Sequence, residues 1–334
     1  MWVPTFQLES LLLNNCILNK GTGHGIPTFI STQRSLNTLE LSHTSLKGTI
    51  PSWLLYNVTI DSLSLRGNFL DDPFPKPTHH NMSTLRGLDI SNNSFSGEFP
   101  PNIDTLFPNL FLFNMSTNEL QGAIPLSLSK LQKLETLDLS QNKLFGEMPE
   151  GLIGNNTSLR YLKLSNNELH GNILSKNWNT SALVVLLLDN NEFTGTIASN
   201  MLRGPSLIVL DLRGNKLSVS FQSLENIESL DLSHNKLVGM IPPQMVQLHS
   251  LSTFSVAFNN LSGAIPHEKQ FLIFDESSYT GNDDLCGPPL HRNCTANNPS
   301  QTRDNKEEEE DDSGILDRPM FFYLLVAISY ALGF

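Results

Sequence analysis

The 334-residue sequence has little of several features on which other classes of protein depend. It has three cysteines, too few for a scaffold built from disulfide bonds. Its formal net charge is −12, which excludes the basic footprint of a nucleic-acid-binding protein. It contains no G-x-S-x-G, H-E-x-x-H or G-x-x-x-x-G-K-[S/T] motif, and the pair His79-His80 has no partners at metal-ligand spacing. The sequence therefore offers no residues for an enzyme, a metal centre or a cofactor site.

The two ends also lack complete targeting segments. The first residues have no basic region, and Gln7, Glu9 and Ser10 interrupt the apolar run, so no signal peptide is predicted. Residues 297–318 are polar and acidic, with six consecutive carboxylates, which predicts a disordered spacer. Only 15 residues follow Pro319, whereas a bilayer-spanning helix needs about 20. Residues 319–334 are either an incomplete transmembrane segment, which we favour, or a frayed apolar tail.

What the sequence does have is one pattern repeated along most of its length. Residues 134–149 read LETLDLSQNKLFGEMP, an L-x-x-L-x-L-x-x-N frame with a glycine and a proline after it. A period of about 20 to 29 residues with this frame is the signature of leucine-rich repeats, which must stack to bury their apolar side chains. The frame begins at Leu36, Ile60, Leu85, Leu110, Leu134, Leu159, Leu183, Leu207, Ile227 and Leu251, with a looser copy at Leu8.

One step between these copies is short. The others are 24 or 25 residues, but Leu207 and Ile227 are 20 apart, and about four residues are missing close to Ser220. Either this repeat is truncated, or two distant parts of a longer protein have been joined here.

The positions within a repeat predict their structural roles. Leu137 and Leu139 alternate with Asp138, as in a strand with one buried face. Stacked strands would form a parallel sheet along the concave side. An asparagine follows the strand in nine copies, and its amide can satisfy backbone groups in the turn. The series is Asn68, Asn93, Asn118, Asn142, Asn167, Asn191, Asn215, Asn235 and Asn259. In the looser copy, Cys16 takes this position as a buried thiol.

The L-x-G-x-I-P ending of several copies, such as Gly122 to Pro125 and Gly263 to Pro266, resembles the plant-specific class of extracellular leucine-rich repeats. That resemblance implies a second short strand in each repeat. We therefore predict an α/β repeat solenoid, a right-handed leucine-rich-repeat superhelix with a concave parallel β-sheet and an irregular, 3₁₀-rich convex side.

The C-terminal part carries a more specific resemblance. The run FSVAFNNLSGAIPHEKQFLIFDESSYTGNDDLCGPPLHRNC looks like the last repeat and cap of plant receptor-like proteins, the kinase-less leucine-rich-repeat receptors of the cell surface. The expected domains are repeats in 1–266, a cap in 267–296, an acidic juxtamembrane spacer in 297–318 and the incomplete transmembrane segment. Cys286 and Cys294 are near enough in sequence to bridge, and an extracellular setting favours that disulfide. Such receptors usually have a non-repeat island about four repeats before the cap. Its absence here implies an internal deletion, besides a missing start.

Nine N-x-S/T sequons support an extracellular ancestry, although repeats rich in Asn and Ser generate some of them automatically. A glycan on Asn114 would obstruct the concave face of its repeat. The candidate glycosylation sites are Asn57, Asn81, Asn92, Asn114, Asn155, Asn156, Asn179, Asn260 and Asn293.

The outward strand positions of three repeats combine apolar and charged side chains, as in an interface core with a polar rim. The alternative is that Val and Ile simply suit strands. The predicted ligand-binding residues are Arg160, Tyr161, Lys163, Val184, Val185, Leu187, Asp189, Ile208, Val209, Asp211 and Arg213.

The favoured function is a non-enzymatic receptor that binds a peptide or protein on this face. The resemblance implies a single-pass plasma-membrane protein with extracellular repeats, which signals in defence or development through a membrane receptor kinase or co-receptor. One alternative is a soluble extracellular inhibitor of a cell-wall-degrading enzyme, and another is a truncated gene product without function. The acidic spacer and the apolar tail argue against the soluble inhibitor.

Overall fold

The computed structural model describes residues 5–21, 23, 25–55, 59–71, 73, 84–149, 151–153, 158–173, 181–195, 206–218 and 227–294. The chain forms two units, residues 1–292 and 293–334, and every helix and strand described below belongs to the first unit. The predicted spacer and transmembrane segment, the shortened region near Ser220, and five predicted glycosylation sites lie outside the described residues; these sites are Asn57, Asn81, Asn155, Asn156 and Asn179.

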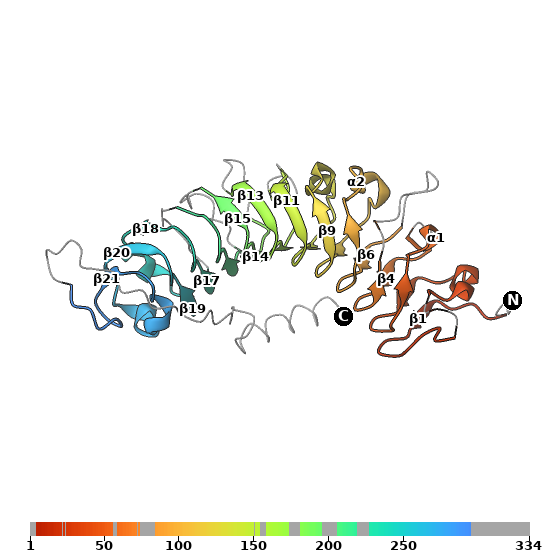
Figure 1. Cartoon of the computed structure of the whole chain (residues 1–334), viewed down its shortest axis with the longest axis horizontal. Helices are drawn as coiled ribbons and strands as arrows, with labels where there is room; N and C mark the ends of the chain where they lie inside the picture. The colour runs from red at the N-terminus through yellow and green to blue at the C-terminus, as the bar shows by residue number, and fades with distance from the viewer. Residues whose placement is uncertain are drawn as a thin grey trace. The chain divides into compact units, whose positions relative to one another are not determined.

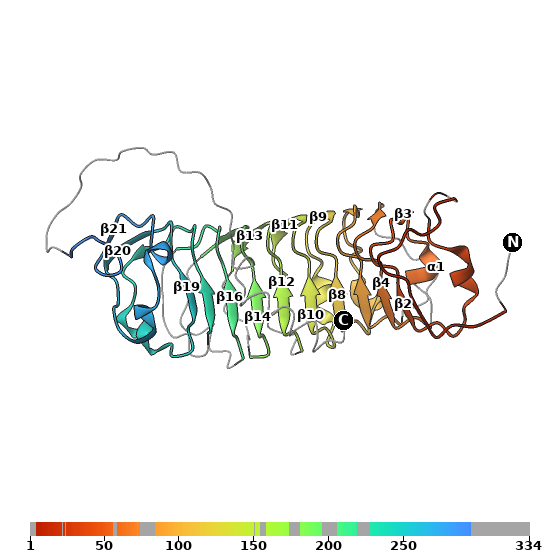
Figure 2. The ribbon, with the colours of Figure 1, turned by 90° about the horizontal axis from the view of Figure 1, so that it is seen from below.

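The main element is a parallel sheet of eleven strands, one from each repeat, that follow one another in chain order. Figure 1 shows this sheet along the inner curve of the stacked repeats, and Figure 2 shows the same strands side by side. The predicted concave parallel sheet is confirmed. Its strands are β1 (Ser10–Leu12), β2 (Thr38–Glu40), β4 (Ser62–Ser64), β6 (Gly87–Asp89), β8 (Leu112–Asn114), β10 (Thr136–Asp138), β12 (Tyr161–Lys163), β14 (Val185–Leu187), β16 (Val209–Asp211), β17 (Ser229–Asp231) and β19 (Thr253–Ser255).

A second row of short strands follows the asparagine positions and forms sheets of two, five and three strands. The second strand implied by the sequence resemblance is thus present in most repeats. These strands are β3 (Lys47–Gly48), β5 (Phe69–Leu70), β7 (Ser96–Gly97), β9 (Glu119–Gly122), β11 (Lys143–Glu147), β13 (Glu168–Asn172), β15 (Glu192–Thr194), β18 (Val238–Gly239), β20 (Asn260–Ala264) and β21 (Asp284–Cys286).

The helical elements are short, and 3₁₀ turns outnumber α-helices among the described residues, as predicted. They include a proline-led turn after several second strands, because proline ends strand pairing and suits the start of a helical turn. The 3₁₀ helices are η1 (Thr28–Thr32), η2 (Leu126–Lys130), η3 (Pro243–Gln247), η4 (Lys269–Leu272) and η5 (Glu276–Ser278), and the α-helices are α1 (Ser52–Leu55) and α2 (Ile103–Leu106).

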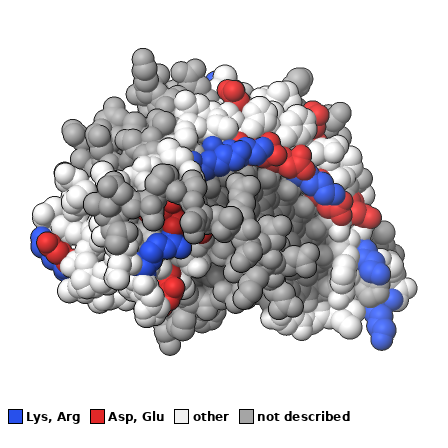
Figure 3. All heavy atoms as spheres, turned by 60° about the vertical axis from the view of Figure 1, so that its left-hand side comes forward, with Lys and Arg blue, Asp and Glu red and all other residues white. Residues whose placement is uncertain are grey.

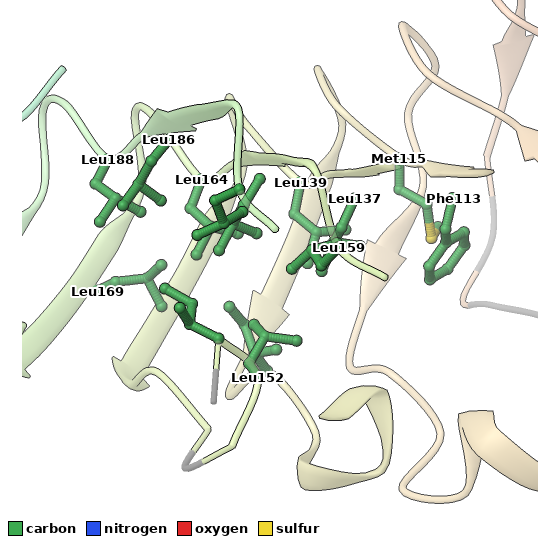
Figure 4. Close-up of a cluster of buried hydrophobic side chains, with 14 of the residues drawn as sticks. Phe113, Met115, Leu137, Leu139, Leu152, Leu159, Leu164, Leu169, Leu186 and Leu188 are labelled. Atoms are coloured by element: carbon green, nitrogen blue, oxygen red, sulfur yellow. The ribbon is translucent and has the colours of Figure 1, made fainter. Parts of the chain in front are cut away.

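A single hydrophobic core runs through the stack from Ile26 to Leu285. Figure 4 shows its middle part, where Leu137 and Leu139 meet leucines of neighbouring repeats. Both side chains have no exposed surface, as predicted from their alternation with Asp138. The pairing register places Leu137 level with Phe113 and Leu162, so that each repeat adds the same layer to the core.

The asparagines form a ladder that ties each repeat to the one before it. The Asn142 amide nitrogen donates to the carbonyl oxygens of Met115 (3.0 Å) and Leu139 (3.1 Å). Its Oδ1 accepts from the backbone N–H of Leu120 at 3.0 Å. These bonds satisfy backbone groups in turns that leave the sheet, as the residue type predicted.

The short step between repeats leaves the long sheet intact. Strands β16 and β17 pair in register, with Leu210 opposite Leu230. The second row also continues across this step through backbone bonds: the Lys216 N–H donates to the Phe193 carbonyl (2.8 Å), and the Lys236 N–H donates to the Leu217 carbonyl (3.1 Å). The shortening therefore falls after the asparagine and outside the segment that builds the long sheet.

The cap continues the repeat pattern for part of a turn. Asn282 takes the ladder position, since it donates to the Val256 carbonyl (3.0 Å) and accepts from the Leu261 N–H (3.0 Å). Strand β21 pairs with β20 and extends the second row. Phe271, Phe274 and Tyr279 surround Phe254 and close the end of the core.

The three cysteines differ in state. Cys286 and Cys294 are each disulfide-bonded, whereas Cys16 is a free thiol. Cys16 is half-buried, not buried as predicted, because the first repeat has no preceding described repeat against its outer side.

Candidate functional site

The candidate site lies on the concave face of the long sheet, over strands β12, β14, β16 and β17 (Figure 2). In each strand the central leucine faces the core, so the residues on either side of it face the other way. Strand pairing sets these outward residues in rows across the sheet. One row contains Tyr161, Val185, Val209 and Ser229, and a second contains Lys163, Leu187, Asp211 and Asp231.

Three of the predicted residues occupy a separate row. Arg160, Val184 and Ile208 each precede their strand by one residue, and Ile208 N–H donates to the Val184 carbonyl at 2.9 Å. Arg160 is exposed and lies 3.6 Å from a carboxylate oxygen of Glu135. The structure thus brings nine of the predicted residues into three parallel rows, and the other two, Asp189 and Arg213, follow β14 and β16 and form an ion pair at 3.8 Å.

The apolar members of the site are not exposed as the sequence interpretation supposed. Val185 and Val209 are each 2% exposed, and Leu187 is 7% exposed. None of the three belongs to the core cluster, which contains the intervening Leu186 and Leu210.

Charged side chains at the site are partly paired. Lys163 Nζ lies 3.5 Å from Asp138, and Arg213 Nη2 lies 3.8 Å from Asp189. Asp189 also accepts a short hydrogen bond from the Ser165 hydroxyl. Burial raises the pKa of Asp189 in spite of the Ser165 hydrogen bond and Arg213.

Asp211 has the strongest electrostatic perturbation of the site. Burial raises its pKa well above the usual value, and the nearby carboxylates of Asp189 and Asp231 raise it further. Its Oδ1 accepts from the backbone N–H of Arg213 at 3.0 Å. A carboxyl in this position gains from a cation close by.

The sequence interpretation missed Ser229 and Asp231, which continue both rows on β17. The signal was available, because the x-L-D triplet appears at Asp138, Asp211 and Asp231 in the same frame. It was overlooked because the patch was defined by its apolar members, and the β17 repeat has none at these positions.

Four predicted glycosylation sites fall within the described residues. Asn92, Asn260 and Asn293 are exposed, whereas Asn114 is half-buried at the end of β8 on the concave side. Asn114 Oδ1 accepts from the backbone N–H (3.0 Å) and the hydroxyl (2.8 Å) of Ser116.

The described parts of the chain contain no cluster of three or more metal-ligating side chains and no helix that is long and apolar enough to cross a bilayer. Figure 3 shows a stripe of basic and acidic side chains along one flank. Exposed ion pairs such as Lys143–Glu119 (3.2 Å) and Lys216–Glu192 (3.1 Å) follow the asparagine ladder, and such pairs contribute little stability.

Comparison with known proteins agrees with this architecture. Residues 35–57, 84–106, 133–155 and 226–248 match the family model described as Leucine Rich Repeat. Receptor-like protein 1 of Arabidopsis thaliana is 38% identical over 133 residues, which make up 39% of this chain and 12% of that protein. Receptor-like protein 15 of the same plant is 36% identical over 136 residues, 40% of this chain and 13% of that protein.

Solved structures extend the match to most of the fold. The leucine-rich-repeat ectodomain of the membrane receptor kinase GASSHO1/SCHENGEN3 from Arabidopsis thaliana aligns with a TM-score of 0.65 and 30% identity, over 81% of this chain and 38% of that one. A plant ice-binding protein aligns with a TM-score of 0.53 and 28% identity, over 87% of this chain and 77% of that one.

The chain therefore has the fold of a leucine-rich-repeat solenoid. Its relatives in sequence are plant receptor-like proteins, and the matched part spans only about an eighth of their length.

Proposed function

We propose that this protein is a non-enzymatic, extracellular ligand-binding receptor that takes a peptide or protein on the concave face over β12 to β17. The observation that carries the proposal is the contrast within each strand. The core-facing position is leucine in all four of these strands, whereas the outward positions change from repeat to repeat. The stability of the stack requires only the core-facing leucines, so the variable outward positions are available for recognising a ligand.

The relatives support this function. GASSHO1/SCHENGEN3 was solved in complex with CASPARIAN STRIP INTEGRITY FACTOR 2, so a related repeat stack serves as a receptor ectodomain. The names of the relatives in sequence describe receptor-like proteins. We extend the proposal to a glycosylated protein of the plasma membrane, anchored by its C-terminal segment. In this proposal a membrane receptor kinase or co-receptor transmits the signal in defence or development.

The experiment is a peptide-display selection on the full-length protein, followed by affinity measurements with the selected peptides. The variant Val185→Arg plus Val209→Arg places two charges in the apolar row. Affinity should fall at least tenfold, because unpaired charge in the centre of an interface is strongly unfavourable.

The matched control is Thr38→Arg plus Ser62→Arg, which makes the same change in the same row on β2 and β4. It should leave affinity unchanged. Undiminished binding by the Val185/Val209 variant, with both variants folded by circular dichroism, would remove these strands from the binding face.

A further inference from the structure

Three carboxylates lie together at the C-terminal side of the candidate site. Asp211 and Asp231 are register partners on adjacent strands, and Asp189 follows β14 in the neighbouring repeat. They are 5%, 7% and 6% exposed, respectively. Strand spacing sets the backbones of Asp211 and Asp231 about 4.8 Å apart.

The cations around this group do not balance it. Arg213 approaches Asp189, and no ion pair among the described residues includes Asp211 or Asp231. On one side, Lys163 is engaged by Asp138; on the other, β19 continues the row with the neutral Ser255. Three carboxylates and one guanidinium leave an excess of two negative charges when all are ionised.

The hydrogen bonds leave acceptor capacity free. Asp211 Oδ1 accepts from the Arg213 N–H (3.0 Å), and Asp231 Oδ1 accepts from the Ser233 N–H (2.9 Å). Neither Oδ2 atom takes a hydrogen bond from a described residue. A carboxylate offers several acceptor positions, so both groups can accept from an outside donor.

Two further polar atoms point to a ligand. Ser229 lies on the same face of β17 as Asp231 and is 8% exposed, and its Oγ has no hydrogen-bond partner among the described residues. Over the same residues, the buried Nε of Arg213 also lacks an acceptor. Buried polar atoms are normally paired. Ser229 and Arg213 are each two residues from a carboxylate of the group, Asp231 and Asp211 respectively.

Two groups that occur together in a basic peptide residue can satisfy these atoms. An ammonium or guanidinium donates to the two carboxylates and the Ser229 hydroxyl oxygen, and a neighbouring carbonyl accepts from Arg213 Nε. A basic residue within a peptide carries both parts. We infer that Asp211 and Asp231, with Ser229, form a subsite for a lysine or arginine side chain of the ligand.

This inference rests on the proposed function and names the chemistry of its ligand. The test uses a peptide-display selection on the full-length protein. Selected peptides should be enriched in Lys or Arg at one position, and replacing that residue by Gln should reduce affinity at least tenfold. The variant Asp211→Asn plus Asp231→Asn keeps the side-chain shape and removes both charges. Its affinity for the selected peptides should also fall at least tenfold.

The matched control is Glu40→Gln plus Asp89→Asn, which removes two charges from the same row on β2 and β6 and should bind the peptide normally. In a double-mutant cycle, the Gln peptide should bind the wild type and the Asp211/Asp231 variant equally. Thermal melting of both variants checks that they are folded.

The outcomes separate the two proposals. Selection of peptides whose affinity does not depend on a basic residue or on Asp211 and Asp231 would overturn the subsite and leave the proposed function standing. A loss of binding on addition of EDTA would also overturn it, because the carboxylates would then hold a divalent cation. Failure to select any peptide or protein would overturn both.

Discussion

The two faces of the long sheet differ although they belong to the same strands. In the long sheet, ten strands follow β1. Eight of them place leucine at the centre on the core side, and the other two place Phe113 and Phe254 there. On the concave side, the corresponding row runs through Thr, Ser, Gly, Leu, Tyr and Val. One face is uniform because every repeat must fit its neighbours, and the other varies because the backbone pairing of the strands does not depend on its side chains.

The comparison teaches where stability and recognition are located. Substitutions on the core side should chiefly lower the free energy of unfolding, whereas substitutions on the concave side should chiefly change ligand affinity. The asparagine ladder belongs with the core in this respect, since its bonds connect one repeat to the next.

The sharpest contrast is between two adjacent residues. Leu137→Ala removes a fully buried side chain and should lower the free energy of unfolding by about 2–5 kcal/mol. Its neighbour Thr136 faces the concave side, and its buried Oγ1 has no partner among the described residues. Thr136→Val should therefore change stability by less than about 1 kcal/mol, in the stabilising direction. Urea unfolding of both variants measures this, and equal losses would contradict the division between the faces.

The ladder should come next in size. Asn142→Ala leaves the Leu120 N–H and the carbonyls that accept from the Asn142 amide without these hydrogen bonds. It should lower the free energy of unfolding by about 1–3 kcal/mol. Lys143→Ala is the control, because its exposed ion pair with Glu119 contributes at most about 1 kcal/mol. Hydrogen exchange of the Leu120 amide offers a local readout, and unchanged protection in the Asn142 variant would show that the bond is dispensable.

The smallest effect should come from a concave carboxylate and should depend on pH. Burial and the charges of Asp189 and Asp231 raise the pKa of Asp211, while Arg213 opposes them. Between the unfolded pKa and the raised folded pKa, the folded protein binds the extra proton, so stability falls as pH rises through this range. At a pH above that range, Asp211→Asn should raise the melting temperature of the protein by a few degrees. This gain in melting temperature should become smaller as the pH is lowered through the range.

The variant Asp283→Asn serves as the control, because it makes the same substitution at an exposed position. A constant difference between Asp211→Asn and wild type from acid to neutral pH would mean that the carboxyl is not perturbed in the folded protein.

Much of the fold was predictable because its signal repeats. The frame around Leu137 and Asn142 appears so often that the regular copies identify the equivalent positions in the irregular ones. The core residues and the asparagine ladder could therefore be predicted from it. The cap was harder. Asn282 lies 23 residues after Asn259 and continues the ladder, but an extra residue before Leu285 breaks the local motif.

The candidate site was only partly predictable. Alternation placed Val185, Leu187 and Asp211 on the concave face, and the structure places them there on adjacent strands. Their burial, and the proximity of Asp189, Asp211 and Asp231, could not be predicted, because they depend on how closely neighbouring strands approach.

The sequence by itself determined the repeat, its inward leucines and its asparagine ladder, because these obey a local period that any stacked neighbour must share. The tertiary structure alone decided that the short step between Leu207 and Ile227 preserves the register of the long sheet. It also decided how deeply Asp211, Ser229 and Asp231 are buried. The physical reason is that backbone pairing between strands fixes register across repeats, and register brings together residues that lie about 20 positions apart in the chain.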